Sequence, residues 1–149
     1  MNTNELKPSE ILREEDWCKG SYAKNAIGEE CSQYSPFAVA FCILGAIYKS
    51  FNNNYGPNID LFSRILVKIC EQFYELKKLI NDKSFIIGTN EFYISNKKEA
   101  IYLLEKAEII YENTLKGTKF PENKEQVFEM IEGLDYSKIV ERMESKIFV

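Results

Sequence analysis

The chain contains no histidine, and the side chains whose spacing makes them candidates for catalysis are its cysteines and its clustered carboxylates. The absence of histidine excludes Ser-His-Asp and Cys-His catalytic arrangements within the chain, together with metal sites that use histidine ligands. No remaining side chain has an ordinary pKa between 5 and 8, so a general base would have to be a Glu, Lys, Cys or Tyr with a shifted pKa.

The cysteines are Cys18, Cys31, Cys42 and Cys70. They lack the close pairing that is typical of zinc ligands, so we expect no metal site, and reduced thiols in a cytoplasmic protein. Cys42 lies in an apolar run and is expected to be a small buried hydrophobe. Cys18 is the better candidate for a reactive thiol, because Lys19 follows it and could lower its pKa. An inert bystander role is nevertheless the favoured interpretation for Cys18.

The clustered carboxylates are Glu14-Glu15-Asp16 and Glu29-Glu30. Each cluster could hold a hard cation or act as a carboxylate pair. Consecutive residues of a helix do not face one another, however, so a solvated surface is the favoured interpretation. The sequence also lacks phosphate-binding, dinucleotide-binding, nucleophile-elbow and EF-hand motifs, so no catalytic residue and no cofactor is predicted.

Aromatic side chains in the polar region that follows could line a ligand pocket, since aromatic rings provide large contact areas at low entropic cost. The ligand-binding residues predicted from the sequence are Trp17, Cys18, Lys19, Tyr22 and Tyr34. Trp17, the only tryptophan, could instead pack its loop against the helix that contains Cys42.

The elements that would position these residues are mainly helices. We expect residues 1–149 to form one globular domain, a compact, mainly α bundle of five to six helices. Residues 19–34 read as an ordered loop, and residues 84–95 are compatible with a short β-hairpin because aromatic and β-branched runs flank a turn. The predicted helices cover 10–17, 36–51, 59–81, 97–115, 122–132 and a final stretch after Asp135.

The helix predicted at 36–51 contains an unexpected glycine. Ser35 and Pro36 would begin this helix as cap and first residue. Gly45, in its apolar interior, costs about 1 kcal/mol of helix propensity relative to Ala. We therefore expect another backbone, that of residues 17–22, to cross the helix at Gly45 within van der Waals contact.

The net charge and the hydropathy of the chain limit the kinds of partner that it is expected to bind. The formal net charge is −4, which argues against nucleic-acid binding. The longest apolar run, residues 37–48, is shorter than the roughly 20 residues that span a bilayer. The first 12 residues show no signal sequence, so a cytoplasmic protein is expected. Nine tyrosines and ten phenylalanines would also allow a homo-oligomer.

In the first third of the chain, a tryptophan–glycine turn is followed by an apolar helix, and this combination is similar to the pattern of a known family. The matching positions are Trp17, Gly20, Ala23, Gly28, Ala38, Val39, Phe41, Cys42, Gly45 and Ala46. They resemble a family of small bacterial and phage proteins described only as a domain of unknown function. The resemblance implies a compact helical fold and no particular activity.

The leading functional hypothesis is a small binding protein without catalytic activity. Its partner would be an unknown protein or a small molecule. If the protein is phage-encoded and acts against host defence, it would occupy a host protein or sequester a metabolite. The alternative is a small histidine-independent enzyme that uses Cys18 or a carboxylate pair.

Overall fold

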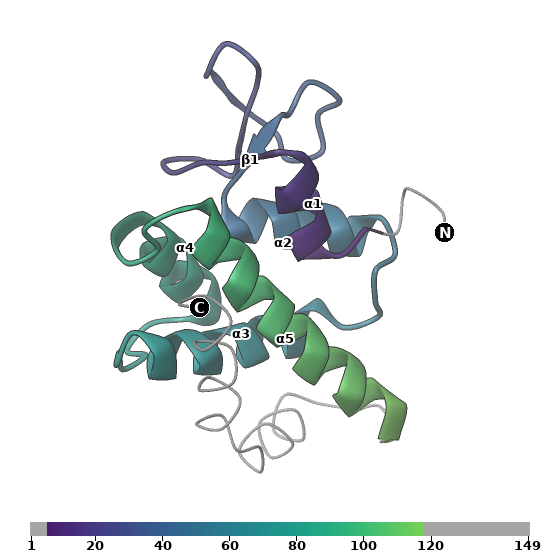
Figure 1. Ribbon diagram of the computed structural model, residues 1–149, viewed down its shortest axis with the longest axis vertical. Coiled ribbons are helices and arrows are strands. Elements are labelled where there is room, and N and C mark those ends of the chain that lie inside the picture. Colours follow the sequence, from purple (N-terminus) through teal and green to yellow (C-terminus); the bar gives the residue numbers. More distant parts are fainter. Residues whose placement is uncertain (1–5, 118–149) are drawn as a thin grey trace.

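The computed structural model describes residues 6–117, so the helices predicted at 122–132 and after Asp135 lie outside the described residues. The described part is mainly helical, with five helices and a small sheet (Figure 1). In chain order the elements are α1 (Pro8–Glu14), β1 (Asp16–Trp17), β2 (Ala23–Lys24), β3 (Glu30–Cys31), β4 (Ala40–Phe41), α2 (Ile43–Asn52), α3 (Ile59–Phe73), α4 (Asp82–Phe92) and α5 (Lys97–Gly117).

The sheet lies beside α1 and α2, at the top of Figure 1, and its strand order is β1-β4-β2-β3. Strand β4 is central: it pairs in parallel with β1 and antiparallel with β2, so Phe41 lies opposite both Trp17 and Ala23. Strand β3 pairs antiparallel with β2, placing Glu30 opposite Lys24. Residues 19–34, expected to be a loop, therefore supply two of the four strands.

Three helices, α3, α4 and α5, form the other part of the molecule. Helices α3 and α5 run antiparallel, since the backbone N–H of Asn58 before α3 donates to the Tyr111 hydroxyl late in α5. At the opposite ends of the two helices, the Tyr74 hydroxyl donates to Glu99. The shared core is closed by α1, which contacts both α2 and α5. Its largest fully buried side chains include Leu12, Phe41, Ile43, Leu44, Ile47, Leu61, Phe62, Ile65, Leu66, Ile69 and Tyr111.

The helix predicted at 36–51 begins only at Ile43. The backbone before it is extended because residues 39–42 are bonded on both sides, with Val39 N–H donating to the Lys24 carbonyl and Val39 C=O accepting from Asp16 N–H. A strand bonded on both sides satisfies the same backbone groups that a helix would. Ser35 therefore does not cap the helix; the Cys42 sulfur does, accepting from Gly45 N–H at 3.3 Å.

The β-hairpin considered for residues 84–95 does not form, because α4 occupies this segment. The Asn81 side chain caps α4 by accepting from Ser84 N–H at 2.8 Å. Phe85, Ile86, Thr89 and Asn90 are its buried residues, and this spacing follows a helix, not alternating strand positions. The aromatic and β-branched residues that favoured strands are used here for packing, which overrides intrinsic propensity.

The helix predicted at 59–81 ends earlier, at Phe73. Glu75 has a φ of 55°, a left-handed conformation that ends a helix, and Leu76 N–H bonds back to the Glu71 carbonyl. The residues from Leu76 to Asn81 thus form the connection to α4. Of the helices that the structure describes, none is both long and apolar enough to cross a membrane.

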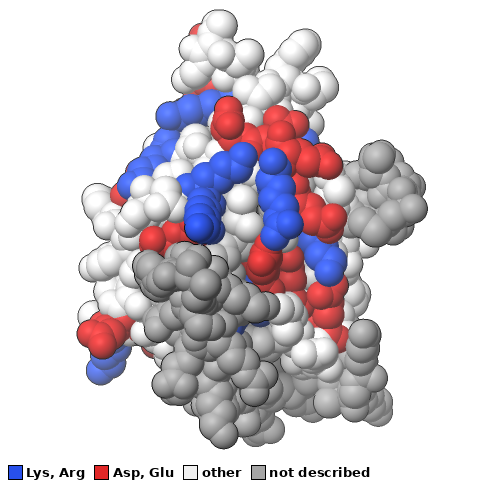
Figure 2. Space-filling view, viewed as in Figure 1, with Lys and Arg blue, Asp and Glu red and all other residues white. Residues whose placement is uncertain are grey.

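The face that carries α1 and α5 shows basic and acidic side chains side by side (Figure 2). Lys7 pairs with Glu112 at 2.8 Å, and Arg13 pairs with Glu105. Both ion pairs join α1 or its N-cap to α5, so the charges on this face neutralise one another instead of forming a continuous basic track.

Candidate functional site

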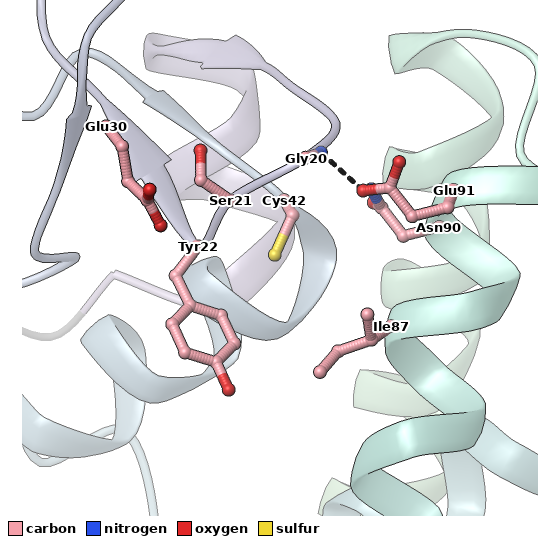
Figure 3. Close-up of a pocket in the computed structure, with 8 residues that line it drawn as sticks. All are labelled: Gly20, Ser21, Tyr22, Glu30, Cys42, Ile87, Asn90 and Glu91. Carbon is pink, nitrogen blue, oxygen red and sulfur yellow. Dashed lines mark hydrogen bonds between the residues drawn. The ribbon is translucent and has the colours of Figure 1, made fainter.

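A pocket of about 350 Å³ lies between the N-terminal sheet and α4 (Figure 3). Its lining comes from four places: the β1–β2 connection, strand β3, the cap of α2, and one face of α4. The Tyr22 ring and the Ile87 side chain lie on opposite sides, with the Cys42 sulfur above and between them in the view of Figure 3. The lining residues are Gly20, Ser21, Tyr22, Glu30, Cys42, Ile87, Asn90 and Glu91.

Asn90 holds the two sides of the pocket together and is 1% exposed. Its Oδ1 accepts from the indole Nε1 of Trp17 at 2.7 Å and from the backbone N–H of Ile43 at 3.1 Å. Its Nδ2 donates to the Cys18 carbonyl at 3.1 Å. One buried amide therefore ties α4 to β1, to the β1–β2 connection and to the first turn of α2.

The crossing predicted at Gly45 is confirmed. A Cβ atom added to Gly45 would lie 2.1 Å from the Tyr22 carbonyl oxygen and 2.9 Å from its carbonyl carbon. The same Tyr22 oxygen accepts from Cys42 N–H at 3.1 Å. The absent side chain lets the Tyr22 backbone lie directly on α2, and this contact sets the position of the Tyr22 wall of the pocket.

Two carboxylates stand on opposite sides of the pocket opening. Glu91 projects from α4 and accepts from the Gly20 backbone N–H. Glu30 projects from β3 on the sheet side (Figure 3). Lys24 lies opposite Glu30 in the sheet, and the residues that line the pocket include no Lys or Arg.

The Tyr22 ring, which lines the pocket, is in turn packed against Tyr48 and Lys83, which do not line it. Tyr22 and Tyr48 pack edge to face, with ring centroids 5.9 Å apart. The Lys83 Nζ lies 5.6 Å from the Tyr22 ring centroid. A hydrogen bond with Tyr22 raises the pKa of Lys83, so this lysine stays protonated beside the ring.

The cysteines near the pocket are held as thiols. Burial raises the pKa of Cys18 to about 11, and the neighbouring Cys42 adds to the rise, outweighing the opposite effect of Lys24. Burial also raises the pKa of Cys42. A thiolate is the nucleophilic form, so this environment gives no support to an enzyme that uses Cys18. All four cysteines are free.

The structure separates the five residues predicted to bind a ligand. Only Tyr22 lines the pocket. Trp17 lies behind it, bonded to Asn90 and packed against the core. Lys19 covers the Trp17 ring with its Nζ 5.4 Å from the centroid, and Cys18 donates to the Ser21 carbonyl. Tyr34, 52% exposed, is outside the lining.

Sequence reasoning missed the contribution of α4. Ile87, Asn90 and Glu91 all fall in the segment for which a short hairpin is considered, with Asn90 and Glu91 in its turn. The available signal was Asn81, a residue type that caps helices and accepts here from Ser84 N–H. Glu30 was noted only as part of an acidic pair, and Glu29 beside it does not line the pocket.

The first acidic cluster does not form a site. Glu14 ends α1, whereas Asp16 begins β1, so the backbone changes direction between them. Across residues 6–117, no group of three or more Cys, Asp or Glu side chains is placed to hold a metal ion.

Comparisons of the chain with protein-family models, with curated proteins and with solved structures found no match.

Proposed function

We propose that the protein binds a small organic cation, an amine or a guanidine on a compact apolar body, in the pocket between the sheet and α4. The observation that carries the proposal is the lining itself: the Glu30 and Glu91 carboxylates flank a floor built from Tyr22, Ile87 and Cys42. An ammonium group would interact with the carboxylates, and its apolar body would cover Ile87 and the Tyr22 ring.

Size and rigidity support a small ligand. A volume of about 350 Å³ is near the lower end of the range for ligand pockets. The walls are held by the Asn90 hydrogen bonds and by the Tyr22–Gly45 contact, so the pocket is formed before any ligand arrives. Preorganisation lowers the entropic cost of binding.

The proposal describes binding without turnover. The thiols beside the pocket are protonated, which favours a binding role over nucleophilic catalysis. Four free cysteines are consistent with a reducing, cytoplasmic environment. In a phage-encoded protein, such a site would sequester a host metabolite.

Binding can be tested with Trp17, which serves as an intrinsic reporter because its indole donates to Asn90 behind the pocket. We expect small alkylamines, arylalkylamines and guanidines to change its fluorescence and to raise the melting temperature. Alcohols and carboxylates of the same shape should do neither. Equal responses to amines and carboxylates, or no response to any amine, would refute the proposal.

Variants assign the response to the pocket. Glu30→Gln and Glu91→Gln keep the shape of the side chains and remove the charges, so we expect weaker amine binding from each. Glu29→Gln is the matched control, because Glu29 neighbours Glu30 but does not line the pocket. If all three variants weaken binding equally, the response reflects overall charge and not this site.

A protein partner is the second candidate, and a different surface favours it. The loops at the far end of the sheet expose Ile27 (79%), Phe37 (75%) and Tyr34 (52%). Exposed apolar groups gathered on loops are typical of protein contacts. Phe37→Ser would distinguish the two functions: it should abolish association with a protein partner and leave the amine response unchanged.

A further inference from the structure

An apolar groove lies on the side of α4 away from the cation pocket. It runs between the α3–α4 connection and α4 itself and has a volume of about 240 Å³. Its apolar side chains are poorly covered: Leu79 and Phe92 are each 82% exposed, Ile80 is 55% exposed and Tyr93 is 46% exposed. Several large apolar groups together on one surface mark a place where another segment packs.

The middle of this groove is a helical glycine. Gly88 lies one turn before Phe92, and a Cβ atom added to it would meet no atom within 4 Å. Gly88 costs helix propensity as Gly45 does, yet it has no crossing backbone among the contacts of the described chain. A glycine in the floor of an open apolar groove leaves room for a close-packed occupant.

The chain itself has a segment that can reach the groove. Helix α5 runs antiparallel to α3, so it ends beside the start of α3, whereas the groove lies beyond the end of α3. The 15 residues of α3 span about 22 Å at 1.5 Å per residue. Residues 118–149 follow α5, and about half of them, even if helical, would cover that distance.

The sequence of this segment has a stripe that matches the groove. Ile139, Val140, Met143 and Ile147 repeat at helical spacing after the Asp135 cap, with Glu141, Arg142, Glu144 and Ser145 between them. An amphipathic helix laid into an apolar groove through residues at this spacing is a common recognition mode.

We propose that the groove formed by Leu76, Leu79, Ile80, Gly88 and Phe92 is the docking site for the chain's own residues 136–149. The apolar stripe of this segment covers Leu79 and Phe92, and Met143 lies over Gly88. The occupant is therefore part of the same molecule, and the cation pocket on the other side of α4 stays open.

Amide hydrogen exchange of the full-length chain tests the docking. In the wild type, amides of residues 76–80 and of α4 should be protected. Met143→Glu should speed their exchange about tenfold or more, and Leu79→Glu should do the same for amides of residues 136–149. Ser145→Glu is the control, because position 145 lies between the apolar residues. Unchanged exchange in Met143→Glu, or equal acceleration in Ser145→Glu, would overturn the proposal.

Cross-linking of the wild type provides the second measurement. It tests the docking even if Met143→Glu unfolds and its amides exchange rapidly throughout the chain. An amine-reactive reagent should join Lys77, on the groove, to Lys138 or Lys146. In a mixture of isotopically labelled and unlabelled chains, the link should form within one chain only. Links between labelled and unlabelled chains would place a second copy in the groove, and the absence of both the Lys138 and the Lys146 link would show that the segment lies elsewhere; both results overturn the proposal.

Discussion

Substitution of Gly45 by Ala should destabilise the protein although Ala is the better helix former. The added Cβ would lie 2.1 Å from the Tyr22 oxygen, so the Tyr22 carbonyl must move by roughly 1 Å to restore van der Waals distance. That oxygen accepts from Cys42 N–H and is followed by the central pairing of Ala23 with Phe41, so the movement disturbs the sheet.

The magnitude follows from opposing contributions. Overpacking typically costs 1–3 kcal/mol, and a strained hydrogen bond costs about 1 kcal/mol more. The better helix propensity of Ala offsets about 1 kcal/mol of this cost. We therefore expect a net loss of about 2 kcal/mol in the free energy of unfolding, which lowers the midpoint of urea unfolding by about 1 M.

The control lies in the same helix. Asn52 is exposed at the end of α2, so Asn52→Ala tests helix propensity without a steric contact, and its midpoint should change little or rise slightly. If Gly45→Ala raises the midpoint as Asn52→Ala does, the Tyr22 backbone does not lie on α2 and the wall of the pocket is wrongly placed.

Three other substitutions or measurements probe the hydrogen bonds and the titratable groups. Asn90→Leu should cost about 3 kcal/mol or more in urea unfolding, because it leaves the Trp17 indole and two backbone groups without partners, whereas Asn90→Asp, which keeps the acceptor, should cost less. Burial raises the pKa of Glu108 to about 7 from 4.5, so the folded state binds its proton more tightly; stability should fall by on the order of 3 kcal/mol as pH rises from about 4.5 to 7, and Glu108→Gln should remove that slope in urea titrations. Iodoacetamide at neutral pH should label Cys18 about tenfold more slowly than an ordinary cysteine, because a pKa of about 11 instead of 9.0 lowers its thiolate fraction about 100-fold and the greater nucleophilicity of that thiolate recovers about tenfold; rapid labelling followed by mass spectrometry would contradict the thiol assignment.

Helical periodicity predicted much of the fold. The stripe from Leu61 to Cys70 marks α3, and Asn96 does accept from Glu99 N–H at the start of α5, as a cap should. These signals are local, since the cap and the stripe each lie within one element. Local signals could be read without knowledge of the partners of the element.

The sheet could not be predicted in the same way. Its strands are two residues long, and β4 is extended only because β1 and β2 bond to it from both sides. The apolar residues from Ala38 to Phe51 continue through strand and helix alike, so periodicity does not mark the change at Cys42. Gly45 was informative because its cost is local and the reason for it is a distant contact, with the Tyr22 backbone.

The candidate site was predicted only on its sheet side. Tyr22 was identified as an aromatic residue in a polar segment, which is a property of its own surroundings. Asn90 forms a hydrogen bond with Trp17, which lies 73 positions away in the sequence, and no local sequence pattern predicts that pairing. The α4 side of the pocket therefore required the tertiary structure.

The bond between Ser9 and Glu108 has a consequence for how the chain acquires its structure. Ser9 N–H donates to the Glu108 carboxylate at 2.8 Å, which joins residues 99 positions apart. Such a contact closes a long loop, and topologies rich in distant contacts fold slowly. During synthesis, α1 would leave the ribosome well before the residues of α5 that cover it. The emerging N-terminal half can pack α1 against α2, but the side of α1 that contacts α5 stays uncovered until late in translation, a period in which a chaperone could shield it.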